Sequence, residues 1–291
     1  MDDVSRRISI VIATRNRKSS LLLTLGRLRQ AYPRVRTIVV DNGSTDGTAA
    51  AVREQFAWAE IIKLGANRGA VARNYGAERA DTSYVAFNDD DSWWAPGALP
   101  LAVNIFDAHP SLGLITGQVL VGPQARLDPT CAEMARSPLR RGACSQWPAV
   151  LGFLAAGAIV RRSAFRAAGG FHSRYGIGGE EELLAIDMAA SGWELAYIDW
   201  IVAYHHPSGQ ARNNARRTTV QLRNALWTAW LRRRVGGALG RTARLIARAG
   251  TSRTTFEALI DALVGLPWVV RERRRVPPEL ESDLRSLESN A

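Results

Sequence analysis

Short apolar runs alternate with longer amphipathic stretches through the first third of the chain. The apolar runs are rich in β-branched residues and bounded by polar ones, which is typical of buried strands. They cover Ile8–Ala13, Thr37–Val40, Glu60–Leu64 and Tyr84–Phe87. Between them, the residue pattern predicts helices over Ser19–Ala31, from Thr45 or Asp46 to about Phe56, and over Gly69–Arg79. Ser19 or Ser20 is the predicted N-cap of the first helix.

This alternation of strand and helix predicts an α/β fold. Strand and helix units at this spacing give right-handed crossovers and therefore a mostly parallel sheet. Three of the strands end in the polar sequences TRNR, DNGS and NDDD. Because parallel strands end at the same edge, we expect these segments to meet there, where open α/β sheets bind their ligands.

The stretch Val85–Trp94, VAFNDDDSWW, places three consecutive carboxylates directly after a predicted strand. Carboxylates this close repel one another, so a fold usually supplies a cation or hydrogen-bond donors beside them, and a hard divalent metal is the simplest such partner. Trp93, Trp94 and Pro96 are expected to end the strand, with a helix starting near Pro96. The alternative interpretation is an exposed acidic turn before that helix.

Two further segments are candidates for nucleotide contacts. Asp41 follows a strand, where it can accept a hydrogen bond from a base or ribose; a simple turn with an N-cap also explains its surroundings. Arg73, in a helix start that carries Gly69, can reach a diphosphate, and the alternative is a solvated surface arginine. Since the chain contains neither GxxxxGK[ST] nor GxGxxG, a phosphate site would be built from a metal and side chains.

Composition restricts the class of protein. The chain has 291 residues, of which 46% are hydrophobic and 22% charged, as in ordinary soluble globular proteins. Cys131 and Cys144 give neither a zinc spacing nor a disulfide framework, and the first residues lack the apolar stretch of a signal peptide. The longest apolar stretch, Ala258–Val270, contains Asp261 and Pro267 and is too short to span a bilayer. We therefore expect a cytoplasmic protein.

The net charge of +11 is concentrated near the C-terminus. Residues 205–275 contain fifteen arginines, no lysine and three acids, whereas residues 1–204 are almost neutral. The residue pattern also becomes mainly helical after residue 206, so we predict an α/β domain over residues 1–206 and a basic, mainly helical appendage over residues 207–291. Such a local excess of positive charge indicates an anionic partner, for example a membrane surface or a phosphate-bearing substrate.

Apolar stripes in this appendage leave two interpretations open. One stripe comprises Leu222, Ala225, Leu226, Ala229 and Trp230, and another comprises Phe256, Leu259, Ile260 and Leu263. The helices can lie on an anionic membrane, which would make the protein peripheral on the inner face. They can instead pack on the α/β domain or on a second subunit of a homodimer. A nucleic-acid partner is not favoured, because no known binding motif accompanies the charge.

Several segments in this order resemble one enzyme family. They are ISIVIATRNR, TIVVDNGSTDGT, NRGAVARNYGA, VAFNDDDSWWAPGAL, AGAIVRRSAFRAAGGFHSRY and GGEEELLAIDMAASGWELAYI. From residue 8 to about residue 206 the chain resembles the inverting, nucleotide-sugar-dependent glycosyltransferases of the GT-A fold, often called glycosyltransferase family 2. The resemblance implies a UDP- or dTDP-sugar donor, an acceptor hydroxyl on a glycan, lipid-linked or small molecule, and a divalent cation, Mn²⁺ or Mg²⁺.

The resemblance also implies a nucleotide and metal site. Asp41 would contact the pyrimidine base, with Thr14 and Arg15 nearby, and Arg73 would lie near the diphosphate. In the family's DXD element Asp89 and Asp91 are the outer acids: Asp91 would bind the metal together with Asp89, and Asp90 would be directed towards the ribose or sugar. His205, thirteen residues after Gly192, matches the metal-ligating histidine, and His206 is its neighbour.

The resemblance places the general base in the sequence Gly179-Glu180-Glu181-Glu182. The spacing to Gly192 aligns Glu181 with the base, which is usually aspartate in the family, and Glu180 is the alternative. Both functions are needed chemically, because a cation stabilises the leaving diphosphate and a carboxylate removes the acceptor proton. The competing hypothesis is a non-catalytic protein with a degenerate GT-A fold that binds nucleotides or a membrane surface.

Overall fold

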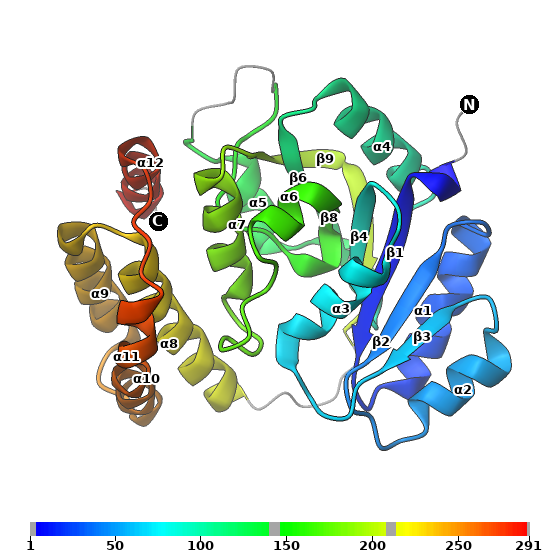
Figure 1. The fold of residues 1–291 in the computed structure, drawn as a ribbon, viewed down its shortest axis with the longest axis horizontal. Coiled ribbons are helices and arrows are strands. Elements are labelled where there is room, and N and C mark those ends of the chain that lie inside the picture. The colour runs from blue at the N-terminus through cyan, green and yellow to red at the C-terminus, as the bar shows by residue number, and fades with distance from the viewer. Residues whose placement is uncertain (1–3, 140–145, 208–213, 290–291) are drawn as a thin grey trace.

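The computed structural model describes residues 4–139, 146–207 and 214–289 (Figure 1). A short 3-10 helix, η1 (Val4–Arg6), precedes the first α/β half. That half comprises β1 (Ile8–Thr14), α1 (Lys18–Ala31), β2 (Thr37–Asp41), α2 (Thr48–Gln55), β3 (Glu60–Lys63), η2 (Gly69–Val71), α3 (Ala72–Arg79) and β4 (Tyr84–Asp89). β1 pairs in parallel with β2 and β4, and β2 pairs in parallel with β3. The predicted parallel α/β fold is confirmed.

The second half completes a mixed sheet. It comprises β5 (Ser92–Trp94), α4 (Ala98–Ala108), β6 (Leu112–Val121), β7 (Arg126–Leu127), α5 (Pro129–Ala135), η3 (Ala155–Gly157), β8 (Ala158–Arg161), α6 (Arg162–Ala167), α7 (Glu180–Ala190) and β9 (Glu194–His205). Within the described residues the sheet order is β3-β2-β1-β4-β8-β6-β9-β5, and β7 pairs with β6. β8 is antiparallel to β4 and β6, and β5 is antiparallel to β9.

Three predicted boundaries were wrong. Trp93, Trp94 and Pro96 were expected to end the fourth strand, but β4 already ends at Asp89, and Ser92–Trp94 forms a further strand that pairs with the end of β9. The N-cap of α1 is neither Ser19 nor Ser20: the helix begins at Lys18, whose amide donates to Asp46 Oδ2 over 3.1 Å. Asp46 also accepts a hydrogen bond from the Thr48 amide, which explains why α2 begins at Thr48 rather than at Thr45 or Asp46.

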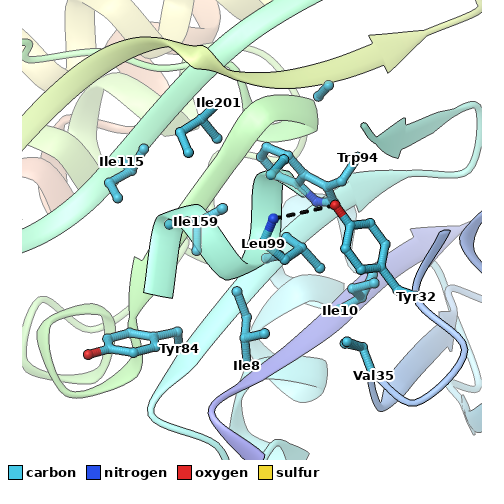
Figure 2. Packing of buried hydrophobic residues seen from close by; sticks show 14 of the residues in the cluster. Ile8, Ile10, Tyr32, Val35, Tyr84, Trp94, Leu99, Ile115, Ile159 and Ile201 are labelled. Carbon is cyan, nitrogen blue, oxygen red and sulfur yellow. Dashed lines mark hydrogen bonds between the residues drawn. The ribbon is translucent and has the colours of Figure 1, made fainter. Parts of the chain in front are cut away.

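Apolar side chains cover both faces of the sheet. Ile8, Ile10 and Ile12 face one buried cluster, whereas Val11 faces a second cluster on the opposite side. Figure 2 shows the first cluster, in which the Leu99 amide donates to the Tyr32 hydroxyl over 3.4 Å. These two apolar clusters hold the sheet in place from both faces and so position the strand ends that carry the polar segments.

The C-terminal helices pack on the body of the protein beside α7 (Figure 1). They are α8 (Asn214–Arg232), α9 (Val235–Ala249), α10 (Arg253–Val264), α11 (Leu266–Arg271) and α12 (Pro278–Ser289). Trp227 and Leu231 of α8 bury against Tyr175 and Leu183 of the body. Within the described residues, no helix combines the length and apolarity needed to cross a bilayer.

Ion pairs reinforce this packing. Arg232 of α8 pairs with Asp187 of α7 through two hydrogen bonds, and His172 Nε2 lies 3.0 Å from Glu272 Oε2. Arg233 is buried between Glu281 and Glu288. Part of the basic excess of the appendage is therefore neutralised inside the molecule, whereas the packing interpretation expected solvated arginines. The first stripe is packed, but Leu222 and Leu226 bury mainly against α10 of the appendage itself.

Candidate active site

A cavity of about 1220 Å³ opens at the carboxyl ends of β1, β2 and β4. The strand register brings Thr14 beside Asp41 and Ala13 beside Asp89. The predicted site residues that line the cavity are Thr14, Arg15, Arg73, Asp89, Asp90, Asp91, Glu180, Glu181 and His205. Segments distant in the sequence thus meet in one space large enough for a nucleotide sugar.

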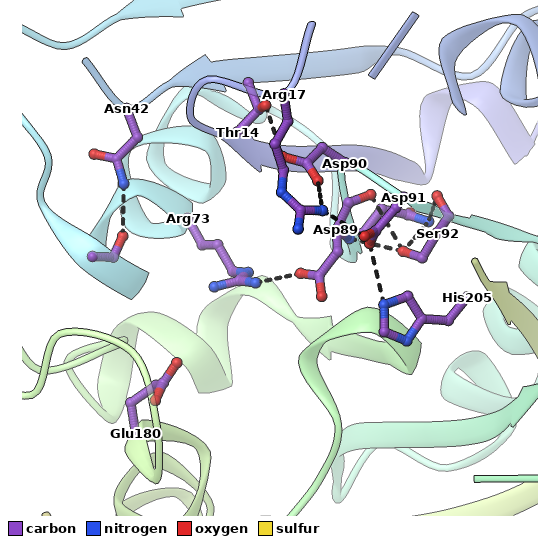
Figure 3. A network of polar contacts seen from close by, with 12 residues as sticks. Thr14, Arg17, Asn42, Arg73, Asp89, Asp90, Asp91, Ser92, Glu180 and His205 are labelled. Carbon is purple, nitrogen blue, oxygen red and sulfur yellow. Dashed lines mark hydrogen bonds and ion pairs between the residues drawn. The ribbon is translucent and has the colours of Figure 1, made fainter. Parts of the chain in front are cut away.

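Arg17 offsets the repulsion among the three aspartates (Figure 3). Its Nη1 lies 2.6 Å from Asp91 Oδ2 and 3.3 Å from Asp90 Oδ1. Thr14 donates from Oγ1 to Asp90 Oδ2 over 2.8 Å. The aspartates are therefore part of an organised polar network, and the alternative of an exposed acidic turn is wrong.

Asp89, Asp91 and His205 converge at one point. One ligand atom from each lies within 4.8 Å of the others, and His205 Nε2 is 3.1 Å from Asp91 Oδ1. The pairing of Ser92 with His205 across β5 and β9 brings the histidine to the acids. Two carboxylates and an imidazole are ligands that suit Mn²⁺ and are compatible with Mg²⁺, so these residues fit a divalent cation.

His206 is excluded from this cluster by its surroundings. Its ring lies edge-on against Trp93, with centroids 4.7 Å apart, and its amide donates to the Asp91 carbonyl over 2.8 Å. Burial and the charge of Arg27 lower the pKa of His206. His206 therefore holds the strand end in place, while His205 is directed towards the acids.

The pKa values of the neighbouring residues Asp90 and Asp91 are shifted in opposite directions. Burial raises the pKa of Asp90 to about 7, and the charge of Arg17 only partly opposes this effect. For Asp91, burial acts in the same direction, but contact with His205 and the charge of Arg17 hold its pKa below the usual value. Asp91 is thus maintained as an anion, which is the form that binds a cation.

Arg73 is a buried cation between the two acidic groups. Its Nη2 lies 2.5 Å from Asp89 Oδ1, and its side chain is 10% exposed. Burial alone would lower the pKa of Arg73, but the charges of Asp89, Glu180 and Glu181 raise it. In Figure 3 Arg73 lies between Asp89 and Glu180. A permanent positive charge is therefore present where the two acidic groups face each other.

Two glycines form the turn directly before α7, and this turn places the first glutamates of the helix at the cavity. Gly178 and Gly179 have φ of 121° and 84°, values that favour glycine, and Gly179 immediately precedes the helix. Glu180 is buried and accepts a hydrogen bond from the Gly178 amide, and Glu181 is half-buried. Glu182 instead faces Arg241, at 3.8 Å. Glu180 and Glu181 are thus the two carboxylates on this side of the cavity.

Burial, followed by the charge of Glu180, raises the pKa of Glu181 to about 8. A carboxylate with a raised pKa is a stronger base than ordinary glutamate, and its proton affinity is better matched to a hydroxyl donor. The site therefore combines a candidate metal cluster, Asp89, Asp91 and His205, on one side with the basic carboxylate of Glu181 on the other.

Comparison with known proteins identifies the family. The profile described as glycosyl transferase family 2 matches residues 9–169, more than half of the chain. The chain belongs to glycosyl transferase family 2. This glycosyltransferase therefore transfers sugars from nucleotide-sugar donors, which agrees with the family resemblance of its motifs.

Curated relatives and solved structures are consistent with the family. The chain is 26% identical to the N-acetylglucosaminyl-diphospho-decaprenol L-rhamnosyltransferase of Mycobacterium tuberculosis over 265 residues, which cover 76% of this chain and 86% of the relative. A mannosyltransferase, PcManGT from Pyrobaculum calidifontis, solved with GDP-Man and Mn²⁺, has a TM-score of 0.60 at 18% identity, covering 99% of this chain and 88% of the other. TarS 1–349 of S. aureus, solved with UDP-GlcNAc, has a TM-score of 0.62 at 16% identity, covering 95% and 83%. The GT-A fold is confirmed.

Sequence reasoning missed several residues that line the cavity of this family 2 enzyme. Arg17 lies in the same TRNR segment as the predicted Arg15, and its spacing from the strand end was a usable signal. Arg216, Arg217 and Arg223 come from α8, beyond the predicted boundary at residue 206, and only the three-dimensional packing reveals them.

Asp41 differs from the other predicted residues. It is 1% exposed and does not line the cavity, whereas its neighbour Asn42 does. Asp41 Oδ1 accepts from the Ser44 amide over 2.9 Å, and its buried Oδ2 has no hydrogen-bond partner among the described residues. Its contact with a base therefore stays a prediction.

Proposed function

We propose that this enzyme is a metal-assisted, inverting glycosyltransferase that moves a sugar from a UDP- or dTDP-sugar to an acceptor hydroxyl. The observation that carries the proposal is the convergence of Asp89, Asp91 and His205 across the cavity from Glu180 and Glu181. The competing hypothesis of a degenerate, non-catalytic fold is not favoured, because both acidic groups are intact and face the same cavity.

The residues divide the chemistry between them. Asp89, Asp91 and His205 would hold Mn²⁺ or Mg²⁺, which when bound stabilises negative charge on the diphosphate. Arg73 adds a second positive charge near the same leaving group. We assign Asp90 to the ribose or sugar, and Thr14 and Arg15, which line the same cavity, to the neighbourhood of the base.

Glu181 is the proposed general base, with Glu180 as the alternative. The acceptor oxygen forms a bond to the anomeric carbon while the bond from that carbon to the diphosphate breaks. The bonding electron pair leaves with the diphosphate, and the acceptor proton passes to the Glu181 carboxylate. Attack from the side opposite the leaving group inverts the anomeric configuration.

A ligand screen tests the donor assignment. We expect UDP, dTDP or their sugars to raise the melting temperature in the presence of Mn²⁺ or Mg²⁺, since a ligand at about 100 times its Kd adds roughly 2.7 kcal/mol. GDP sugars serve as the comparison. Asp91→Ala should lose the metal-dependent rise in melting temperature, and Asp199→Ala, at an exposed position outside the cavity, is the matched control that should keep it. A shift with GDP alone would overturn the pyrimidine assignment.

We further propose that the acceptor is lipid-linked and that the enzyme acts at the cytoplasmic face of an anionic membrane. The Mycobacterium tuberculosis relative is named for a diphospho-decaprenol acceptor. In this chain, Phe256, Ile260, Leu263 and Val264 form an outer face of α10 and are between 45% and 75% exposed. Val270 is exposed beside Arg271, so apolar and cationic side chains occur together, as at a lipid surface.

A further inference from the structure

One face of α8 contributes to the wall of the active-site cavity. Arg216, Arg217, Val220 and Arg223 all line it, and their spacing places them along one side of the helix. The cavity thus receives several arginines from the appendage, in addition to Arg73 and Arg17 from the α/β half. The roles already described use none of the α8 side chains.

Arg223 is a half-buried cation whose partners are neutral. Its Nη2 donates to the Tyr175 carbonyl over 3.0 Å and to Asn224 Oδ1 over 2.9 Å, and its guanidinium lies 4.3 Å from the centre of the Trp227 ring. Burial lowers the pKa of Arg223, and Asp261 opposes this only in part. A buried charge without a counter-ion is costly, so a complementary anion would stabilise this arrangement.

Two arginines at the end of α8 and directly after it show the contrast. Arg232 pairs with Asp187, and Arg233 pairs with Glu281. Among the described residues, neither Arg217 nor Arg223 has a carboxylate within ion-pair distance. Arg232 is therefore neutralised by the body, whereas Arg217 and Arg223 bring positive charge to the cavity.

This charge lies on the base side of the cavity. Arg223 and Asn224 both bond to the Tyr175 carbonyl, and Asn224 also donates to the Gly178 carbonyl over 2.6 Å. Tyr175 and Gly178 belong to the loop that leads directly into Glu180 and Glu181. Because the base contacts the acceptor, a ligand group beside this loop belongs to the acceptor rather than to the donor diphosphate near Arg73.

We propose that Arg217 and Arg223 bind a diphosphate ester carried by the acceptor. The inference rests on the proposed transferase function and defines its acceptor class. The two residues are about 9 Å apart along the helix axis and about 120° apart around it. Both line the cavity, so their long side chains can reach two adjacent phosphates from two directions. Guanidinium groups match phosphate oxygens through paired hydrogen bonds, which lysine cannot reproduce.

Calorimetry on the full chain tests the proposal with three probes: geranyl diphosphate, geraniol and inorganic pyrophosphate. The donor side is first saturated with Mn²⁺ and the nucleoside diphosphate found in the ligand screen. We expect geranyl diphosphate to bind more tightly than pyrophosphate and geraniol not to bind. The single substitutions Arg217→Gln and Arg223→Gln should each lower the affinity for geranyl diphosphate by about tenfold or more and leave the affinity for the nucleotide unchanged.

The controls separate the possible failures. Arg53→Gln with Arg248→Gln removes two exposed arginines that do not line the cavity and should leave geranyl diphosphate affinity unchanged. Arg217 is exposed, so Arg217→Gln remains informative if Arg223→Gln disturbs packing. Unweakened geranyl diphosphate binding in both variants, or equal affinity for pyrophosphate, would overturn the proposal. Failure of the wild type to bind any nucleotide would instead reject the proposed transferase function.

Discussion

Glu180 and Glu181 are adjacent in the sequence but have different surroundings. The Glu180 carboxylate accepts a hydrogen bond from the Gly178 amide, whereas the Glu181 carboxylate is half-buried and has a raised pKa of about 8. Glu181→Gln should therefore retain nucleotide binding but lose at least ~100-fold in turnover, the scale expected for a general base. Glu180→Gln should cost less. A larger loss in Glu180→Gln, measured by release of nucleoside diphosphate, would transfer the role of base to Glu180.

The pH profile gives a second test of Glu181. The base must be ionised to accept a proton, and burial with the charge of Glu180 raises its pKa to about 8. Turnover at saturating donor should therefore rise with pH through a midpoint near 8 and level off above about 9. Glu180→Gln removes the neighbouring charge, so the midpoint should move to lower pH, and Glu182→Gln should leave it in place. An unchanged midpoint in Glu180→Gln would contradict this coupling.

The acids and His205 were predictable because each follows a recognisable segment in the expected order. Arg17 was missed, although it lies in the TRNR segment close to the strand end, because its pairing with Asp91 depends on the three-dimensional arrangement of the two strand ends. The cavity position of Arg223 was beyond prediction, since it depends on contacts with Tyr175, which is distant in the sequence. Local motifs therefore predict the members of this candidate metal cluster better than they predict its counter-ions.

At the scale of elements, Asn224 joins α8 to the loop that carries the glutamates. It is fully buried, and its amide donates to the carbonyls of Tyr175 and Gly178. Asn224→Ala leaves both buried carbonyls with fewer donors and should lower the free energy of unfolding by about 1–3 kcal/mol. Asn104→Ala, at an exposed position on α4, is the control for urea denaturation. Equal stability of the two variants would show that this connection contributes nothing.

The elements themselves were predicted unevenly. The first four strands and their helices follow from local periodicity, and the structure confirms them with shifts of a few residues. β5 was missed because Ser92–Trp94 becomes a strand only by pairing with β9, whose register is set by the whole sheet. Similarly, the predicted helix over Gly69–Arg79 begins as a 3-10 turn. Gly69 lies too close to the backbone of Gly176 to carry a side chain, a contact that the local pattern does not show.

For the whole molecule, the apolar stripes prove to have different environments. The stripe of α8 is packed, with Leu226 at 4% exposure, whereas the outer face of α10 is open to solvent. We expect the intact protein to co-sediment with anionic vesicles at low salt and to be released as salt rises, because each basic residue near the surface contributes about 1 kcal/mol. Leu263→Asp with Val264→Asp should weaken this binding.

Neutral vesicles and the exposed, polar position Ser282→Asp serve as controls for the vesicle experiment. If the α10 face instead joins two copies of the chain, the wild type should sediment as a dimer and the double variant as a monomer. A monomer that binds no anionic vesicle at any salt concentration would reject the membrane proposal.

The central claim is that Asp89, Asp91 and His205 form the metal site of a nucleotide-sugar transferase. Release of nucleoside diphosphate from the donor sugar, with water as acceptor, measures this chemistry without knowledge of the natural acceptor. We predict release that requires Mn²⁺ or Mg²⁺, stops with EDTA, is lost in Asp91→Ala and persists in Asp199→Ala. Undiminished release in EDTA, or in Asp91→Ala, would contradict the account.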